Sequence, residues 1–164
     1  MGFLRQEVDS IQLANYILAK VGPMSHLKLQ KLIYYTQAWH LAYFKERLIK
    51  DDFQAWLHGP VSLKVWKNFK SNENPLLNKI EVEPLAAQSA KAHLAHNLTK
   101  DQHQLIDDVL KEYGNRTSYH LECLTHAEKP WMDARKGVGI ADKCSNVIST
   151  ETMATFYRTK AVKQ

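Results

Sequence analysis

A run of nineteen residues, His26–Phe44, contains neither glycine nor proline, and apolar or aromatic side chains fall on most of its faces. A helix that lies on the surface of a domain needs only one apolar stripe. A helix that is apolar nearly all round must instead be covered on several sides. The sequence therefore predicts a central, buried helix here, with the rest of the chain arranged around it.

Shorter helical patterns flank this run, and each has a recognisable start or stop signal. Apolar residues at helical spacing predict a helix that begins after Asp9–Ser10 and ends at Gly22–Pro23. Thr99–Gln102 has the spacing of a capping box and opens a helix that extends to Tyr113. Further short helices are expected after Thr117–Ser118, at Pro130–Trp131 and after Ser149–Thr150. These signals predict a mainly α fold of about six to eight helices in a single compact domain.

At most a small β element is expected beside these helices. Phe53–Leu57 is short and aromatic, so it is a candidate strand or extended segment. Pro60 fits the first turn of a helix that extends to Phe69, which would place Gly59 at the helix cap. On this basis we expect Trp56 to pack against the central helix.

Residues 71–98 are the least defined part of the chain and a candidate variable segment. Ile80–Glu83 alternates like a strand edge, Pro84 would end that strand, and the alanine-rich stretch Leu85–Leu98 is compatible with a helix.

Size and composition favour one globular domain over residues 1–164. Apolar residues make up 45% of the 164 residues and charged residues 24%, which is typical of such domains. Two cysteines, Cys123 and Cys144, are too few for a disulfide framework, and the N-terminus does not resemble a signal peptide. No apolar stretch approaches the roughly 18 residues of a membrane span. We therefore expect a cytoplasmic protein with no membrane partner.

The net charge of +5 permits an acidic partner or a phosphate backbone. The candidate residues for nucleic-acid binding are Lys64, Lys67 and Lys70, with Lys45, Arg47 and Lys50. Basic residues otherwise occur only in short clusters, so nucleic-acid binding is the less favoured alternative.

His120, Cys123 and His126 form the best candidate for a metal or thiol enzyme centre. Steps of three residues on a helix would let adjacent pairs of these side chains share a metal ion, and the outer pair lies about 120° apart around the helix. The trio does not match a zinc pattern. The sequence also contains no phosphate-binding loop, dinucleotide fingerprint or nucleophile elbow. We expect no catalytic, metal or cofactor site and no enzyme activity.

The tryptophans and two isolated polar residues are the better candidates for partner binding. Tryptophan is common both in cores and among interface hot spots, so Trp39, Trp56 and Trp131 are candidate anchors. Lys31 and His58 are polar residues in apolar, aromatic surroundings. A buried ammonium must reach water or find a carboxylate or helix-end carbonyls. We expect Lys31 beside the Gly59–Pro60 turn or beside Trp131.

Seven short segments follow one another in order along the chain: Leu29–Tyr35, Ala38–Leu41, Phe53–Trp56, Gly59–Val61, Trp66, Leu124–His126 and Pro130–Trp131. Their sequences, order and spacing resemble the Panacea domain family of SocA-like antitoxins and GepA phage-associated proteins. The resemblance covers about residues 9–158.

This resemblance implies a helical bacterial or prophage protein that neutralises a cognate toxin, encoded nearby, by binding it. In a variation of that role, the domain is an adaptor that delivers the toxin to a protease. Some relatives add a DNA-binding segment, for which this chain has no space, and His58 stands where relatives often have tyrosine. We expect the partner-binding surface to contain Lys31, Tyr34, Trp39, Trp56, His58, Gly59, Pro60 and Trp131.

Overall fold

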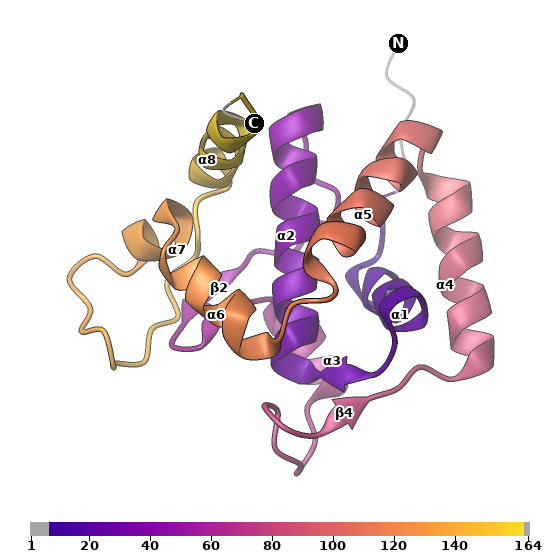
Figure 1. The fold of residues 1–164 in the computed structure, drawn as a ribbon, viewed down its shortest axis with the longest axis horizontal. Coiled ribbons are helices and arrows are strands. Elements are labelled where there is room, and N and C mark those ends of the chain that lie inside the picture. Colours follow the sequence, from indigo (N-terminus) through magenta and orange to yellow (C-terminus); the bar gives the residue numbers. More distant parts are fainter. Residues whose placement is uncertain (1–6, 163–164) are drawn as a thin grey trace.

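The centre of the molecule is the long helix α2 (His26–Phe44), which is buried over nearly its whole length. In the computed structural model, which describes residues 7–162, α2 runs through the middle and other helices surround it (Figure 1). Ser25 caps α2 by accepting a hydrogen bond from the Lys28 backbone N–H, and Lys45 ends it in the left-handed conformation. The predicted central helix is confirmed.

Eight helices and two small two-stranded sheets make up residues 7–162, so the predicted mainly α fold is confirmed. The other helices are α1 (Ser10–Val21), α3 (Leu63–Phe69), α4 (Pro84–Asn97), α5 (Lys100–Tyr113), α6 (Ser118–His126), α7 (Lys129–Ala134) and α8 (Thr150–Val162). The strands are β1 (Met24–Ser25), β2 (Gln54–Trp56), β3 (Gly59–Val61) and β4 (Lys79–Ile80). Helices α1, α5, α6 and α8 all pack against α2. No helix in the described range is both long and apolar enough to cross a membrane.

Side-chain caps fix the ends of the helices where the sequence indicated them. The Asp9 carboxylate accepts from the Gln12 N–H at the start of α1. At the start of α5, Thr99 and Gln102 form the expected reciprocal capping box, with bonds of 3.2 and 3.0 Å. Each cap satisfies backbone donors that the first turn of a helix leaves free.

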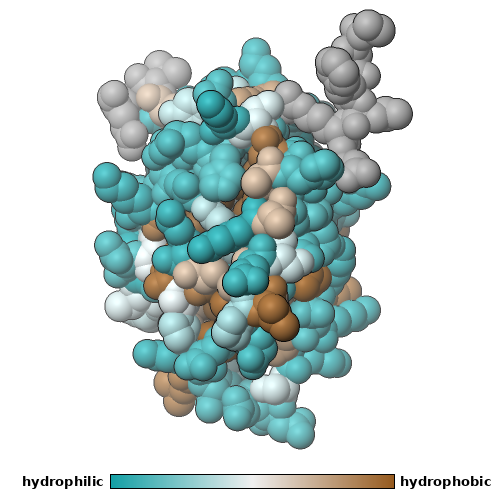
Figure 2. All heavy atoms as spheres, turned by 90° about the vertical axis from the view of Figure 1, so that its right-hand side faces the viewer, coloured by the Kyte–Doolittle hydropathy of each residue, from teal (hydrophilic) through white to brown (hydrophobic). Residues whose placement is uncertain are grey.

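The segment 71–98 forms a short strand and then a helix. Strand β4 pairs antiparallel with β1, with Met24 opposite Ile80 and Ser25 opposite Lys79. The expected strand edge is therefore present but covers only Lys79–Ile80. Helix α4 then packs along α1, and Figure 2, viewed from that side, shows mostly hydrophilic atoms with smaller apolar patches between them. The outer face of α4 thus faces solvent.

The prediction that Pro60 begins a helix is wrong. Pro60 lies in β3 opposite Ala55, and α3 begins three residues later with Ser62 as its cap. Neither backbone group of Ala55 pairs with Pro60: the Ala55 carbonyl accepts from Arg135 at 2.9 Å, and the Ala55 N–H donates to the Asn146 carbonyl at 2.8 Å. Proline is tolerated in β3 because its strand partner does not need an N–H from it. Gly59 accordingly begins β3, directly after the hairpin turn, and is not at a helix cap.

One buried carboxylate connects three parts of the chain. Glu128 lies between α6 and α7 and accepts hydrogen bonds from the hydroxyls of Tyr35 and Tyr157, at 2.7 and 2.8 Å. Its second oxygen contacts the Lys160 ammonium at 2.8 Å. The carboxylate thereby joins α2 and α8 to the α6–α7 junction.

Candidate functional site

The β2–β3 hairpin brings several of the family-like segments to one place on α2. Its strands are antiparallel, with Trp56 opposite Gly59, and Leu57 and His58 form the turn. The backbone φ of Gly59 is +107°, a conformation that favours glycine. The buried side chain of Gln30, on α2, clamps the end of the hairpin: it accepts from the Ser62 N–H at 2.9 Å and donates to the Ser62 carbonyl at 3.3 Å.

Lys31 lies directly beneath this turn, as the sequence led us to expect. Its side chain is 1% exposed, and a Cβ added to Gly59 would overlap its Cε and stand 3.2 Å from its Nζ. Among residues 7–162 no carboxylate or carbonyl oxygen lies within hydrogen-bond distance of Nζ. Burial lowers the pKa of Lys31 to about 7, while Glu122 acts in the opposite direction.

Glu122, on α6, is the carboxylate of this cluster. It contacts His58 Nδ1 at 2.7 Å on the exposed side and lies 4.0 Å from Nε2 of His126. Burial lowers the pKa of His126, Glu122 opposes that shift and Lys31 adds to it. His126 Nε2, like Lys31 Nζ, is buried without a hydrogen-bond partner in the described residues. Two neighbouring groups whose pKa values are both lowered by burial are a feature often found at functional sites.

Two side chains from the α7 region bind the backbone of β2. Trp131 lies on α7, and Arg135 follows it directly. The Trp131 indole donates to the Trp56 carbonyl at 2.9 Å, and its ring stacks on His126 with centroids 4.0 Å apart. Arg135 donates to the Ala55 carbonyl at 2.9 Å and lies over the Trp131 ring. The backbone of β2 is therefore fixed by side chains from a distant part of the sequence.

An apolar pocket of about 570 Å³ opens on the outer face of the hairpin. Trp56, His58 and Trp66 line it, with Lys143 and Cys144 from the loop after α7. The ring of Trp56 lies edge-on to that of Trp66 with centroids 5.1 Å apart. A concave, mostly apolar surface with a few polar groups at its border is what a protein or ligand site requires.

The structure brings together six of the eight predicted partner-binding residues. Lys31, Trp56, His58, Gly59, Pro60 and Trp131 lie in or beside the hairpin. Gly59, opposite Trp56, is the residue that meets Lys31.

Tyr34 and Trp39 lie elsewhere. Tyr34 is 1% exposed and is part of the aromatic core, where its hydroxyl lies 3.2 Å from that of Tyr157. Trp39 is near the far end of α2, where its indole donates to the Tyr113 hydroxyl at 2.9 Å. Both belong to the family-like segments of α2, but their positions around and along the helix place them away from the hairpin.

Sequence reasoning missed Glu122 and Arg135 as members of this region, and it did not single out Gln30 and Thr125 within their family-like segments. Thr125 Oγ1 would lie 3.0 Å from a Cβ at position 59, so it completes the tight packing around the turn. Gln30 could have been identified from the sequence, because it is a polar residue within an apolar segment. For the other three residues only the tertiary fold reveals the contact.

The structure gives little support to the alternative hypothesis of an enzyme or metal centre at His120, Cys123 and His126. Within residues 7–162, no group of three or more His, Cys, Asp or Glu side chains is arranged to hold a metal ion. His126 takes part in the hairpin cluster, whereas His120 and Cys123 are exposed on the surface of α6.

The basic cluster considered for nucleic-acid binding is partly neutralised. Lys64 pairs with Asp9 at 2.6 Å, Arg47 with Asp52 at 2.9 Å and Lys50 with Glu7 at 3.3 Å. Cations already paired with carboxylates contribute less to phosphate binding.

The fold and the hairpin together define a small helical domain with an apolar pocket beside its central helix. The chain belongs to the family described as "Antitoxin SocA-like, Panacea domain", whose model matches residues 29–132, from α2 to α7. The resemblance noted in the sequence is thereby confirmed. Membership points to a regulatory, non-enzymatic role.

One curated relative is "Antitoxin SocA" of Caulobacter vibrioides (strain NA1000 / CB15N). The two chains are 28% identical over 139 residues, which cover 82% of this chain and 74% of the relative. No solved structure matches the chain significantly.

Proposed function

We propose that this protein is an antitoxin that neutralises a cognate toxin, encoded by a neighbouring gene, by binding it through the hairpin surface. This surface is defined by Trp56, His58, Trp66, Lys143 and the pocket between them. The relative named Antitoxin SocA and the family match support the antitoxin role. The observation that carries the proposal is the convergence of distant family-like segments on this one hairpin.

The chemistry of the surface suits a protein partner. Trp56 is half-buried and supplies apolar area, while His58 is exposed and carries a polar head beside it. Large aromatic residues around a pocket, with charged groups at the rim, are typical of interface hot spots. Direct binding would cover part of the toxin and so block its action.

Co-expression with the toxin tests the proposal. The wild-type protein should relieve growth arrest and co-purify with the toxin. The variant His58→Ala/Lys143→Ala, which removes two exposed rim groups, should weaken binding at least tenfold without lowering the melting temperature. Leu85→Ala is a matched control, since Leu85 is 80% exposed on α4, away from the hairpin, and should bind normally. Normal binding by the rim variant would exclude the hairpin as the toxin-binding surface.

The lifetime of the toxin distinguishes occlusion from delivery to a protease. Occlusion leaves the amount of toxin unchanged or higher when the antitoxin is co-expressed. An adaptor lowers the amount of toxin, and deletion of the protease restores it.

A further inference from the structure

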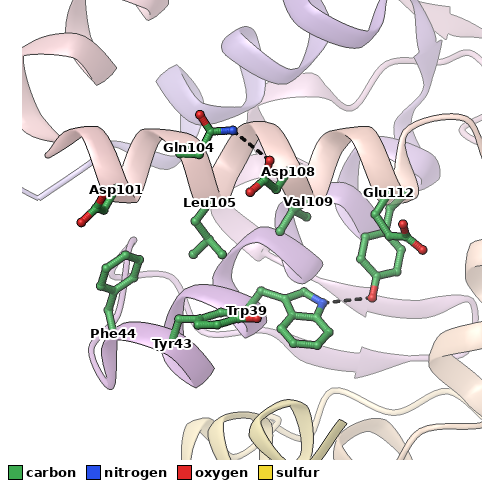
Figure 3. Close-up of a pocket in the computed structure, with 10 residues that line it drawn as sticks. Trp39, Tyr43, Phe44, Asp101, Gln104, Leu105, Asp108, Val109 and Glu112 are labelled. Carbon is green, nitrogen blue, oxygen red and sulfur yellow. Dashed lines mark hydrogen bonds between the residues drawn. The ribbon is translucent and has the colours of Figure 1, made fainter. Parts of the chain in front are cut away.

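A second hollow, of about 630 Å³, lies between the C-terminal half of α2 and helix α5 (Figure 3). Trp39, Tyr43 and Phe44 form its floor from α2, and Leu105 and Val109 face them from α5. We call this hollow the α2–α5 groove. Trp39 and Lys31 are eight residues apart on α2, about 12 Å along the helix axis, so this groove is separate from the hairpin surface.

The floor of the groove is apolar and partly open to solvent. Tyr43 is 61% exposed, and Leu105 is half-buried. Trp39 is fixed by its hydrogen bond to the Tyr113 hydroxyl and lies beside Tyr43, with ring centroids 6.0 Å apart. Because the Trp39 indole is already fixed beside the exposed Tyr43, little side-chain entropy is lost when a partner binds, and this favours affinity.

The rim of the groove is acidic, although the protein as a whole is basic. Asp101, Asp108 and Glu112 follow one another along α5 at intervals of seven and four residues, which places them on one side of the helix. Asp101 and Asp108 are exposed and have no ion-pair partner within residues 7–162; Asp108 accepts a hydrogen bond from Gln104. Glu112 pairs with Arg116 at 2.9 Å. Two carboxylates beside the aromatic floor therefore remain available to a cation.

We infer that the α2–α5 groove docks a cationic amphipathic segment of a partner protein. Its apolar side chains would lie on Trp39, Tyr43 and Leu105, and its Lys or Arg heads would reach Asp101 and Asp108. The stem of an arginine fits an aromatic floor and its guanidinium fits a carboxylate rim. Acidic peptides and nucleic acids are repelled by the same rim. An apolar groove along helices accepts such a segment in helical form.

The probe for this inference is a synthetic 14-residue peptide with leucine and arginine at helical spacing, titrated into the ¹⁵N-labelled full-length protein. The indole N–H resonance of Trp39, assigned with Trp39→Phe, reports on the groove. The indole resonances of Trp56 and Trp131 report on the hairpin. Binding in the groove shifts the Trp39 signal and leaves the other two in place. A peptide with glutamate in place of arginine should leave all three unchanged.

Asp101→Asn/Asp108→Asn should weaken binding of the arginine peptide about two- to thirtyfold at low salt, since each exposed ion pair contributes modestly. Tyr43→Ala should also weaken it. Glu73→Gln/Glu81→Gln, which changes two exposed carboxylates outside the groove, is the matched control and should bind as the wild type does. The inference is overturned if the Trp39 signal does not move, or if Asp101→Asn/Asp108→Asn binds as tightly as the control variant.

Discussion

The backbone of Gly59 rests on the side chain of Lys31, so at this point only the Lys31 side chain separates the hairpin from the backbone of the central helix. A Cβ at position 59 would overlap Lys31 Cε and approach Thr125 Oγ1 to 3.0 Å. Gly59 also has φ of +107°. The glycine is therefore required twice, once for its backbone conformation and once for the space it leaves.

The substitution Gly59→Ala tests this packing. Positive φ costs an alanine about 1–2 kcal/mol, and forcing a methyl group into a tight site costs about 1–3 kcal/mol. We expect a loss of about 2–4 kcal/mol in the free energy of unfolding, measured by urea denaturation.

Gly22→Ala separates the two costs. Gly22 has nearly the same φ, +109°, but a Cβ there would meet no atom within 4 Å. It should therefore lose only the backbone part. Equal losses for the two variants would show that the contact between Gly59 and Lys31 is not tight.

The stability of the protein should rise with pH in the alkaline range because of Lys31. Burial lowers its pKa to about 7 in the folded state, compared with 10.5 in the unfolded chain. Between these values the unfolded chain binds more protons, so the free energy of unfolding increases with pH, by at most about 1.4 kcal/mol per unit from this group. Urea denaturation at pH 7.5, 8.5 and 9.5 measures the increase.

Lys31→Met is the control for this pH dependence. Other groups titrate in the same range, so the relevant quantity is the difference in stability between the wild type and the variant. Met keeps the apolar stem and removes the ammonium, so the variant should be the more stable at pH 7.5, and its advantage should shrink toward pH 9.5. A constant difference would mean that Lys31 is not the titrating group.

The same variant should weaken toxin neutralisation if the proposed function holds. Lys31 is partly protonated at neutral pH, close to its pKa of about 7, and the ammonium form attracts Glu122, which in turn holds His58 at the hairpin surface. Without the charge, Glu122 and His58 lose part of what fixes their positions. We expect weaker co-purification with the toxin while the melting temperature does not fall by more than a few degrees. Normal neutralisation by Lys31→Met would assign Lys31 no part in positioning the surface.

Local signals in the sequence were enough for most helices. The apolar run His26–Phe44 and the capping box at Thr99–Gln102 specify their helices from neighbouring residues alone. The Pro60 prediction failed because the same local preference, φ near −65°, suits a strand as well as a helix start. Pairing with β2 decides between them, and that pairing depends on tertiary contacts.

The candidate site was predictable only in part for a related reason. Resemblance to a family indicated which segments matter, and the polarity of Lys31 within an apolar helix indicated a special environment. Glu122 and Arg135 meet the hairpin only after α6 and α7 fold back on α2, and no short-range pattern in the sequence encodes that. Trp39 belongs to the right segment but lies two turns along α2, where it takes part in a different surface.

Glu128 should prove to be one of the most sensitive positions in the structure. Its carboxylate is buried, accepts from Tyr35 and Tyr157, and pairs with Lys160. Glu128→Gln keeps the shape but removes the charge, so we expect a loss of about 2–4 kcal/mol in the free energy of unfolding by urea denaturation. Glu151→Gln, an exposed position on α8, should change it by less than about 0.5 kcal/mol.

Tyr157→Phe tests whether the carboxylate acts through these hydrogen bonds. The hydroxyl donates to a charged acceptor, so its removal alone should cost about 1.5–3 kcal/mol. The double variant Glu128→Gln/Tyr157→Phe should lose clearly less stability than the sum of the losses of the two single variants, because both changes break the same hydrogen bond. Strict additivity would mean that Glu128 stabilises the junction of α2, α7 and α8 without the help of Tyr157.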